Sequence, residues 1–314
     1  MTVIAGATHR SARLGLAQVC AAAVLWGTGG LVVTVLHERD GLGAMTVSAW
    51  RMALAAVTLM GFAVVTRRMG SVRETMRTHP LLAVGVGCGT ALYQGLYFVS
   101  VLLVGVSVAT VVALGLAPVI AAVWEHLTGR TRPTWREVGV LTAALVGLVL
   151  ISANAGHGSV APGSDPTLGL VLAVASGTTY AATTVLGHRL AQRVDPVALT
   201  TCATAAGALA LAPFFVVAAA AGDPVLSSDA GSLGLLVYLG VATMALSYGL
   251  LYAGLRTTSG SAATVATLVE PLSAALLAAL VLGERLTGPA LVGGALILAA
   301  VVALRPTQEH SLPA

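Results

Sequence analysis

The amino-acid sequence predicts an all-α integral membrane protein in which ten transmembrane helices form two inverted repeats of five. Composition is the first reason: hydrophobic residues make up 57% of the 314 residues and charged residues only 9%. Soluble domains carry about 25% charged residues, so most of this chain must face lipid. The other two reasons are a series of ten apolar segments, each close to the roughly 20 residues that cross a bilayer, and an internal repeat.

The apolar segments follow one another with short connections, and several begin at a proline. Pro80, Pro133, Pro196 and Pro289 stand at segment starts, where the missing N–H costs no helical hydrogen bond. The first segment is too long for the core of a signal peptide and is assigned as a membrane helix. The predicted spans are 14–36, 44–66, 80–102, 105–127, 134–153, 168–190, 197–219, 233–254, 261–282 and 289–304.

The internal repeat consists of residues that recur 154 positions later. Leu14–Leu16 returns as Leu168–Leu170, and Ala109–Val111 returns as Ala263–Val265. A constant spacing over separate segments is difficult to obtain by chance. The second span departs from the pattern, because Arg51 falls opposite Ala205. We therefore expect two five-span repeats, 14–153 and 168–306, joined by a short flexible connection.

The distribution of arginine predicts the topology. All sixteen basic residues are arginine, and thirteen of them lie in segments that face the cytoplasm if the N-terminus is inside. Only Arg39 and Arg285 lie on the other side, and Arg51 lies within a span. This bias follows the positive-inside rule and places both termini in the cytoplasm. Because five is an odd number, the two repeats then have opposite orientations in the membrane.

Composition also excludes several classes of function. Without lysine the chain has neither a Walker A phosphate loop nor a Schiff-base lysine for a pyridoxal cofactor. The histidines lie in tails or near span ends, and no aspartate lies at mid-span, so an intramembrane enzyme is not expected. Cys20, Cys88 and Cys202 lack metal-ligand spacing and are interpreted as packing residues. No cofactor, metal ion or nucleic-acid partner is expected.

Several motifs resemble a known family of carriers. Residues 262–272 read Ala-Ala-Thr-Val-Ala-Thr-Leu-Val-Glu-Pro-Leu, and Leu282-Gly283-Glu284-Arg285 follows after an apolar run. This is similar to the second repeat of EamA-type transporters of the drug/metabolite transporter superfamily. Trp26-Gly27, Arg51 and Pro118 resemble the first repeat, whereas Gly129-Arg130-Thr131 departs from its usual Leu-Gly-Glu-like turn. The resemblance implies a cytoplasmic-membrane carrier, often an exporter of amino acids or related small metabolites.

Two charged residues within the spans are candidates for substrate binding. Glu270 lies near the middle of the ninth span, directly before Pro271, which leaves a backbone carbonyl unpaired and can open the helix. A charged acid at this depth costs about 2.5–3.5 kcal/mol on insertion scales. It is either a ligand for a substrate amine or a proton, or a structural acid that holds the bend. Arg51 either binds a substrate carboxylate or pairs with an acid, or it extends its side chain to the membrane surface or caps backbone carbonyls.

The aromatic residues suggest where a substrate would lie. Trp26 falls opposite Tyr180 under the 154-residue spacing, and both lie near the middle of their spans, where aromatics that serve only as interface anchors are not expected. Gln94 falls opposite Tyr248, and Phe98 opposite Tyr252. We predict a central cavity between spans one, three, six and eight, with ordinary helix packing as the alternative. The predicted substrate-binding residues are Trp26, Tyr93, Gln94, Tyr97, Tyr180, Tyr248, Tyr252 and Glu270.

The sequence thus predicts a secondary transporter that works by alternating access in the lipid bilayer on a small-molecule substrate. A structural or receptor-like membrane protein is the alternative, although no loop exceeds about fourteen residues and could form a partner domain. Proton coupling, and the choice between a monomer and a homodimer, stay open.

Overall fold

A computed structural model describes residues 2–129, 132–153, 165–281 and 287–304, and every regular element in these ranges is a helix. Within these ranges, nine helical stretches are long and apolar enough to cross a membrane, and a tenth apolar helix is shorter. The elements are α1 (Thr2–Asp40), α2 (Ala44–Val65), α3 (Met69–Thr78), α4 (Pro80–Val104), α5 (Val106–Gly129), α6 (Trp135–Ser152), α7 (Pro166–Ala191), α8 (Pro196–Ala221), α9 (Ala230–Gly240), the π-helix η1 (Val241–Leu246), α10 (Ser247–Gly254), α11 (Gly260–Ala266), α12 (Val269–Val281) and α13 (Gly288–Ala303).

Local sequence explains where many of these helices begin. Asp165 and Asp195 precede the first prolines of α7 and α8, and their carboxylates accept hydrogen bonds from first-turn N–H groups, as favourable N-caps do. Pro133 does not begin its helix as predicted. Thr134 caps α6 instead, in a reciprocal pair of hydrogen bonds with Glu137, because a threonine followed three residues later by glutamate forms a capping box.

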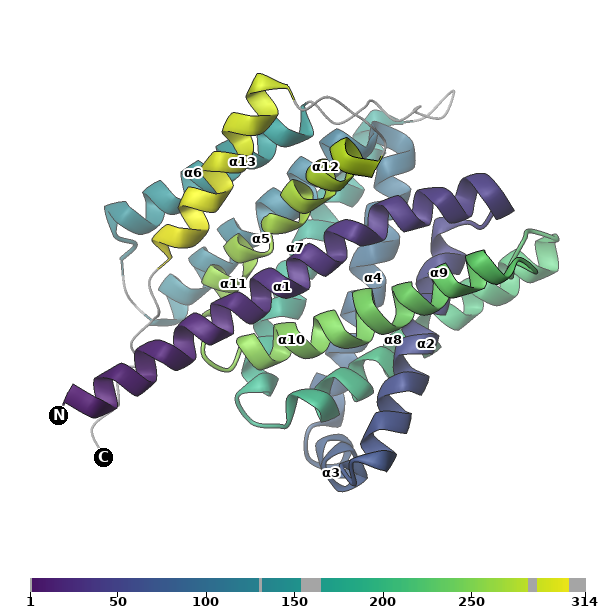
Figure 1. Cartoon of the computed structure of the whole chain (residues 1–314), viewed down its shortest axis with the longest axis horizontal. Coiled ribbons are helices and arrows are strands. Elements are labelled where there is room, and N and C mark those ends of the chain that lie inside the picture. Colours follow the sequence, from purple (N-terminus) through teal and green to yellow (C-terminus); the bar gives the residue numbers. More distant parts are fainter. Residues whose placement is uncertain (1, 130–131, 154–164, 282–286, 305–314) are drawn as a thin grey trace.

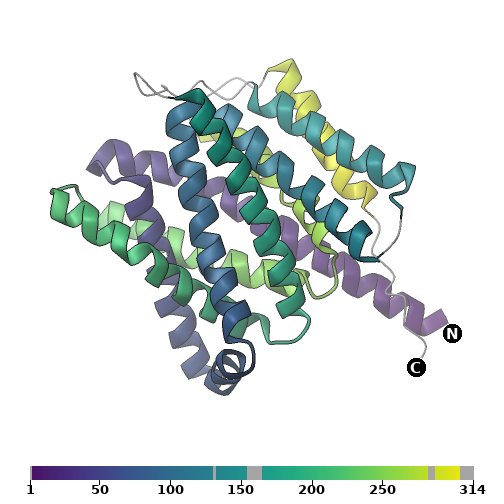
Figure 2. The same cartoon turned by 180° about the vertical axis from the view of Figure 1, so that it is seen from behind.

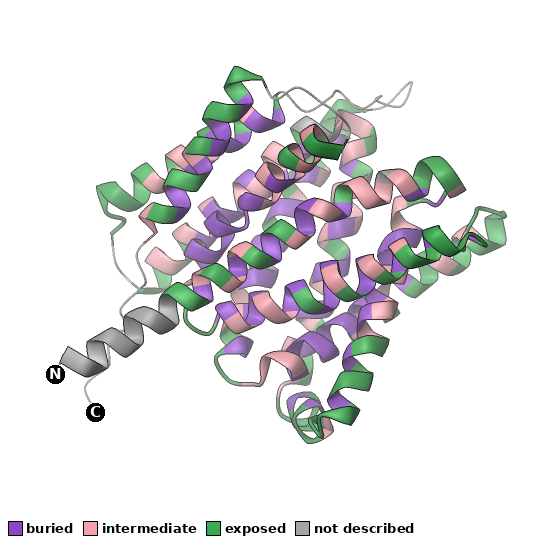
Figure 3. Ribbon diagram, viewed as in Figure 1, coloured by how far each residue is buried: buried purple, intermediate pink, exposed green. Residues whose placement is uncertain are grey.

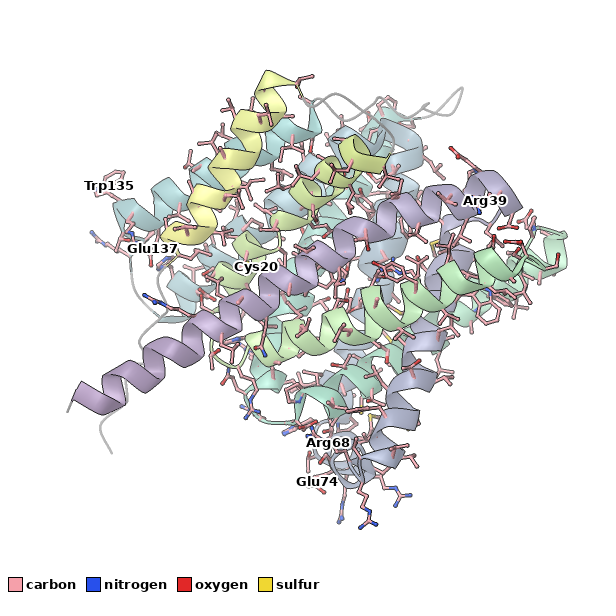
Figure 4. All side chains as sticks on the ribbon, in the orientation of Figure 1. Cys20, Arg39, Arg68, Glu74, Trp135 and Glu137 are labelled. Atoms are coloured by element: carbon pink, nitrogen blue, oxygen red, sulfur yellow. The ribbon has the colours of Figure 1, made fainter. Side chains whose placement is uncertain are left out.

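Three elements depart from the predicted series of uninterrupted spans. A short helix, α3, occupies the segment between the second and third spans. It buries Val72 and Thr75 and exposes the side chains of Arg73 and Glu74, the second of which is labelled in Figure 4. Arg68, just before α3, pairs with Asp195 at 3.0 Å. The eighth span contains η1, and the ninth is divided between α11 and α12. The predicted Leu282-Gly283-Glu284-Arg285 turn lies outside the described residues.

Most of the packing joins helices of one half of the chain to helices of the other. In Figures 1 and 2, α4 lies along α7, α2 along α8, and α6 along α13, while α1 runs beside α10 and α12. Glycines allow the closest approaches. A Cβ added to Gly147 would lie 2.6 Å from the carbonyl oxygen of Gly293, and one added to Gly293 would lie 2.6 Å from that of Gly147. The two halves therefore interlock and share one interior, as close-packed membrane helices do.

The buried residues follow this shared interior. Figure 3 shows buried positions on the inward faces of the helices and exposed positions on the outward faces. The exposed positions include many large apolar side chains, such as Leu81 and Val302, which suit contact with lipid. The largest buried cluster contains Trp26, Tyr248 and Tyr252, so aromatic residues from both halves lie in the core.

Candidate functional site

Two aromatic pairs lie between the two halves of the chain. The rings of Trp26 on α1 and Tyr248 on α10 are 5.0 Å apart and tilted by 55°. The rings of Tyr93 on α4 and Tyr180 on α7 are also 5.0 Å apart and tilted by 45°. Each pair takes one ring from each half, and both distances fall within the range of favourable aromatic contacts.

A hydrogen bond between two tyrosine hydroxyls joins the pairs. The hydroxyls of Tyr93 and Tyr248 are 2.7 Å apart, so the four rings form one chain from α1 to α7. Its outer members are held in turn: the Trp26 Nε1–H donates to Ser247 Oγ at 2.8 Å, and the Tyr180 hydroxyl donates to Thr267 Oγ1 at 3.1 Å. We refer to Trp26, Tyr93, Tyr180 and Tyr248 as the aromatic chain.

Arg51 and Glu270 lie close enough to the aromatic chain to act on it electrostatically. The two charges attract each other, and both act on Tyr93. In the described part of the chain, however, no direct ion pair neutralises either charge. The Nε of Arg51 is buried without a hydrogen-bond partner, and no side chain among the described residues bonds the Glu270 carboxylate. A buried donor without a hydrogen-bond partner is costly, which favours a bound ligand as the partner of Arg51.

The break in the ninth span sets the position of Glu270. Pro271 has no N–H, so the helix loses one internal bond, and α11 ends at Ala266 before α12 begins at Val269. The Glu270 N–H turns back to the Thr267 carbonyl at 2.9 Å, and the Ser273 hydroxyl donates to the Glu270 carbonyl at 2.8 Å. The predicted opening of the helix at this proline is confirmed, and it places Glu270 in the first turn of α12.

Gly27 explains how α1 reaches this break. A Cβ at Gly27 would lie 2.0 Å from Ser273 Oγ and 2.7 Å from the carbonyl oxygen of Glu270. The absence of a side chain therefore lets the backbone of α1 pass directly over the first turn of α12. It also brings Trp26, the residue before Gly27, to the level of Glu270.

The remaining predicted residues lie around this centre or away from it. Tyr252 is almost completely buried and contacts the Tyr248 ring at 6.0 Å, and Gln94 is buried with an unpaired Oε1. The Tyr97 hydroxyl bonds Thr110 Oγ1 at 2.7 Å, between α4 and α5. Pro118 lies apart, within α5 at the edge of another cavity.

Two cavities are lined in part by predicted residues. A small cavity beside Tyr248 and Tyr252 is lined by residues of α2, α4, α8 and η1, but not by Trp26, Tyr180 or Glu270. A larger cavity of about 530 Å³ lies at the predicted cytoplasmic end, between α5, α6, α11 and α13. Trp135 and Glu137 mark its neighbourhood in Figure 4. Ring contacts and hydrogen bonds join the members of the aromatic chain in this structure.

Sequence reasoning missed the residues that hold the aromatic chain. Ser247 and Thr267 are small hydroxyl residues in apolar segments, and many such residues in the chain only bond their own helix. Tyr238 was also missed, although its hydroxyl lies 2.7 Å from that of Thr28. The position of Ser247 directly before Tyr248 was the available signal in the sequence, but only the fold brings the Ser247 hydroxyl to Trp26.

Glu125 at the rim of the large cavity joins the two halves. Its carboxylate accepts hydrogen bonds from the N–H of Ser261 at 2.9 Å and from the Ser261 hydroxyl. Replacing Glu125 with glutamine removes the charge from both bonds, so we expect a loss of roughly 1 kcal/mol of stability for this half-exposed pair. Thermal unfolding in detergent measures this loss of stability as a lower melting temperature. Glu74→Gln on exposed α3 is the control, and equal melting temperatures for the two variants would contradict the prediction.

Comparison with known proteins follows the same division of the chain. Residues 13–153 and 167–305 each match the EamA-like transporter family. The chain is 28% identical over 294 residues to the uncharacterized inner membrane transporter YicL of Salmonella typhimurium, covering 93% of this chain and 95% of that protein. It is 27% identical to the uncharacterized transporter YwfM of Bacillus subtilis, covering 94% and 96%.

A solved crystal structure shares the fold. It superposes with a TM-score of 0.75 at 19% sequence identity and covers 92% of this chain and 95% of that one. The family match spans nearly the whole sequence, and the helices are those of a multi-pass membrane protein. The resemblance seen in the sequence is therefore confirmed, and the chain belongs to the EamA-like transporter family.

Proposed function

We propose that this protein is a secondary active transporter that moves small metabolites, such as amino acids or related compounds, across the cytoplasmic membrane by alternating access. Ten membrane helices form two inverted five-helix repeats, with both termini in the cytoplasm. The substrate binds where the repeats meet, at the aromatic chain, Arg51 and Glu270. Export is the expected direction, in line with the resemblance to EamA-type carriers.

The observation that carries this proposal is the pair of opposite charges without direct partners at the centre of an apolar protein. Charged groups at membrane depth normally face a cavity, a partner or a transported ion. A structural role would be expected to join Arg51 and Glu270 directly, but no ion pair does so among the described residues. A zwitterionic substrate would satisfy both, with its carboxylate at Arg51 and its amine at Glu270.

The arrangement of the helices supports inverted repeats. The contacts occur in corresponding pairs: α1 packs against α10 as α7 packs against α4, and α1 packs against α12 as α7 packs against α5. Gly15 and Gly169, 154 positions apart, lie at the close approaches of α1 to α10 and of α7 to α4. Such a pseudo-symmetric pair can exchange conformations around a fixed central site.

Transport by purified protein in liposomes tests the proposal directly. Liposomes loaded with an unlabelled mixture of amino acids should take up a labelled amino acid by exchange, without ATP, and empty liposomes should not. A panel of acidic, basic, aromatic and small neutral amino acids identifies the preferred substrate. Absence of exchange for the whole panel, with protein shown to be folded, would favour the structural or receptor-like alternative.

The aromatic chain is expected to select the substrate. Replacing Trp26 or Tyr248 with alanine should change the relative affinities for the amino acids of the panel by roughly tenfold, because a stacking contact contributes about 0.5–1.5 kcal/mol. Competition between labelled and unlabelled amino acids measures this. Leu255→Ala, at a fully buried position, is the packing control. Equal loss of yield in all three variants, with preference unchanged, would make Trp26 and Tyr248 packing residues.

A further inference from the structure

The two aromatic pairs match each other with a shift of one residue. Trp26 and Tyr180 are 154 positions apart, which is the spacing of the sequence repeat. Their ring partners, Tyr248 and Tyr93, are 155 positions apart. Under the repeat spacing the counterpart of Tyr93 is Ser247, and the counterpart of Tyr248 is Gln94. The second half therefore presents its aromatic residue one position later than the sequence repeat predicts.

The π-helix η1 sets the rotation of Tyr248 about the axis of its helix. It occupies Val241–Leu246, directly before Ser247, whereas α4 of the first half is a continuous α-helix through Tyr93. An α-helix turns by about 100° per residue, and a π-helix, with its i→i+5 bonds, winds one extra residue into a turn. After such a segment each residue occupies the position that its predecessor would have in an unbroken α-helix. Tyr248 thus takes the place that Ser247 would have if the helix were α-helical throughout.

We propose that η1 is a positioning element for the candidate site, and that its extra residue exists to bring Tyr248 opposite Tyr93. With a regular helix, Ser247 would face Tyr93 and the tyrosine would turn away by about 100°. The link between the two pairs, the 2.7 Å contact of the hydroxyls of Tyr93 and Tyr248, would be lost. The link to transport rests on the proposed function, but the geometry does not.

The side chains around η1 agree with this role. Ser247, the residue before Tyr248, accepts the hydrogen bond of Trp26 and donates to the Thr243 carbonyl within η1 at 2.6 Å. Thr243 and Met244 are fully buried, whereas Val241 and Leu246 face outward with 37% and 52% exposure. Two large side chains of η1 thus stay outside the core, and π-segments within α-helices frequently occur at functional sites.

A matched pair of single-residue deletions tests the proposal. Leu246 and Leu92 are leucines at the same place in the two repeats, with 52% and 54% exposure. Deleting Leu246 removes the extra residue, so η1 should become α-helical and the residues on both sides should keep their positions. Deleting Leu92 from the continuous helix α4 must rotate the residues before or after this position by about 100° about the helix axis.

Buried cysteines report the register without any need for transport. In a variant whose three native cysteines are replaced by alanine, single cysteines are placed at Ser232 or Ser247 for the Leu246 deletion, and at Ala83 or Ser100 for the Leu92 deletion. All four positions are fully buried, and a shift of one residue would move each to an exposed neighbouring position. We expect both cysteines to stay unreactive to a maleimide in detergent after the first deletion, and one to react after the second.

Exchange in liposomes is the second readout. The Leu246 deletion should keep transport within about threefold of the parent, and the Leu92 deletion should lose more than about tenfold. A reactive cysteine at position 232 or 247 would overturn the proposal, and so would loss of transport with both cysteines still buried. If the Leu246 deletion does not fold, deletion of Val241 repeats the test, and failure of both overturns the proposal. A parent without transport would contradict the proposed function and leave the labelling result valid.

Discussion

Replacing Glu270 with glutamine is expected to lower exchange of the preferred amino acid by about 10- to 100-fold. Glutamine keeps the size and shape of the side chain but removes the charge. A hydrogen bond to a charged group contributes about 1.5–3 kcal/mol, which corresponds to that range. Because the Glu270 carboxylate has no protein partner among the described residues, the loss should appear in substrate binding and leave the melting temperature unchanged.

The same variant also tests proton coupling. If Glu270 carries the coupled proton, exchange by the parent should vary between about pH 5 and pH 8, and exchange by Glu270→Gln should not. Glu74→Gln, the same substitution on the exposed surface of α3, is the control for effects of net charge. Parent-like exchange by Glu270→Gln across this range would show that Glu270 only holds the bend of the ninth span.

The sequence was most informative where the chemistry of one residue determines the local structure. Pro271 predicts an opened helix beside Glu270, and α11 and α12 separate there. The repeat spacing relates Trp26 to Tyr180, and the structure places these residues at the two ends of the aromatic chain. A missing N–H acts on its own helix, and a constant spacing can be seen in the sequence itself, so neither requires knowledge of the packing.

The sequence was least informative about the rotation of helices in lipid. A helix in water shows its buried face by a pattern of polar and apolar residues, but apolar residues on all sides remove that pattern. The residues of η1, Val-Ala-Thr-Met-Ala-Leu, give no sign of the extra residue in the turn. The repeat related Tyr248 to Gln94, but it gave no sign that the Tyr248 hydroxyl contacts that of Tyr93.

The link between α1 and the broken ninth span leads to a second large effect. Replacing Gly27 with alanine is expected to reduce exchange more than tenfold and to destabilise the protein by about 1–3 kcal/mol, as overpacking of a close contact does. The new methyl group would lie 2.7 Å from the backbone carbonyl oxygen of Glu270 and 2.0 Å from Ser273 Oγ. The serine can rotate away, but the carbonyl cannot, so α1 and α12 must separate.

Gly29→Ala is the matched control, two residues further along the same helix. A Cβ there would meet Leu239 and Thr243 only at 3.9 Å, which is an ordinary contact, and alanine is favoured over glycine within a helix by about 1 kcal/mol. Its melting temperature and exchange should equal or exceed those of the parent. Separation of α1 from α12 would move Trp26 away from Glu270, so Gly27→Ala should also weaken substrate binding. Parent-like exchange by Gly27→Ala would mean that the site does not depend on this contact.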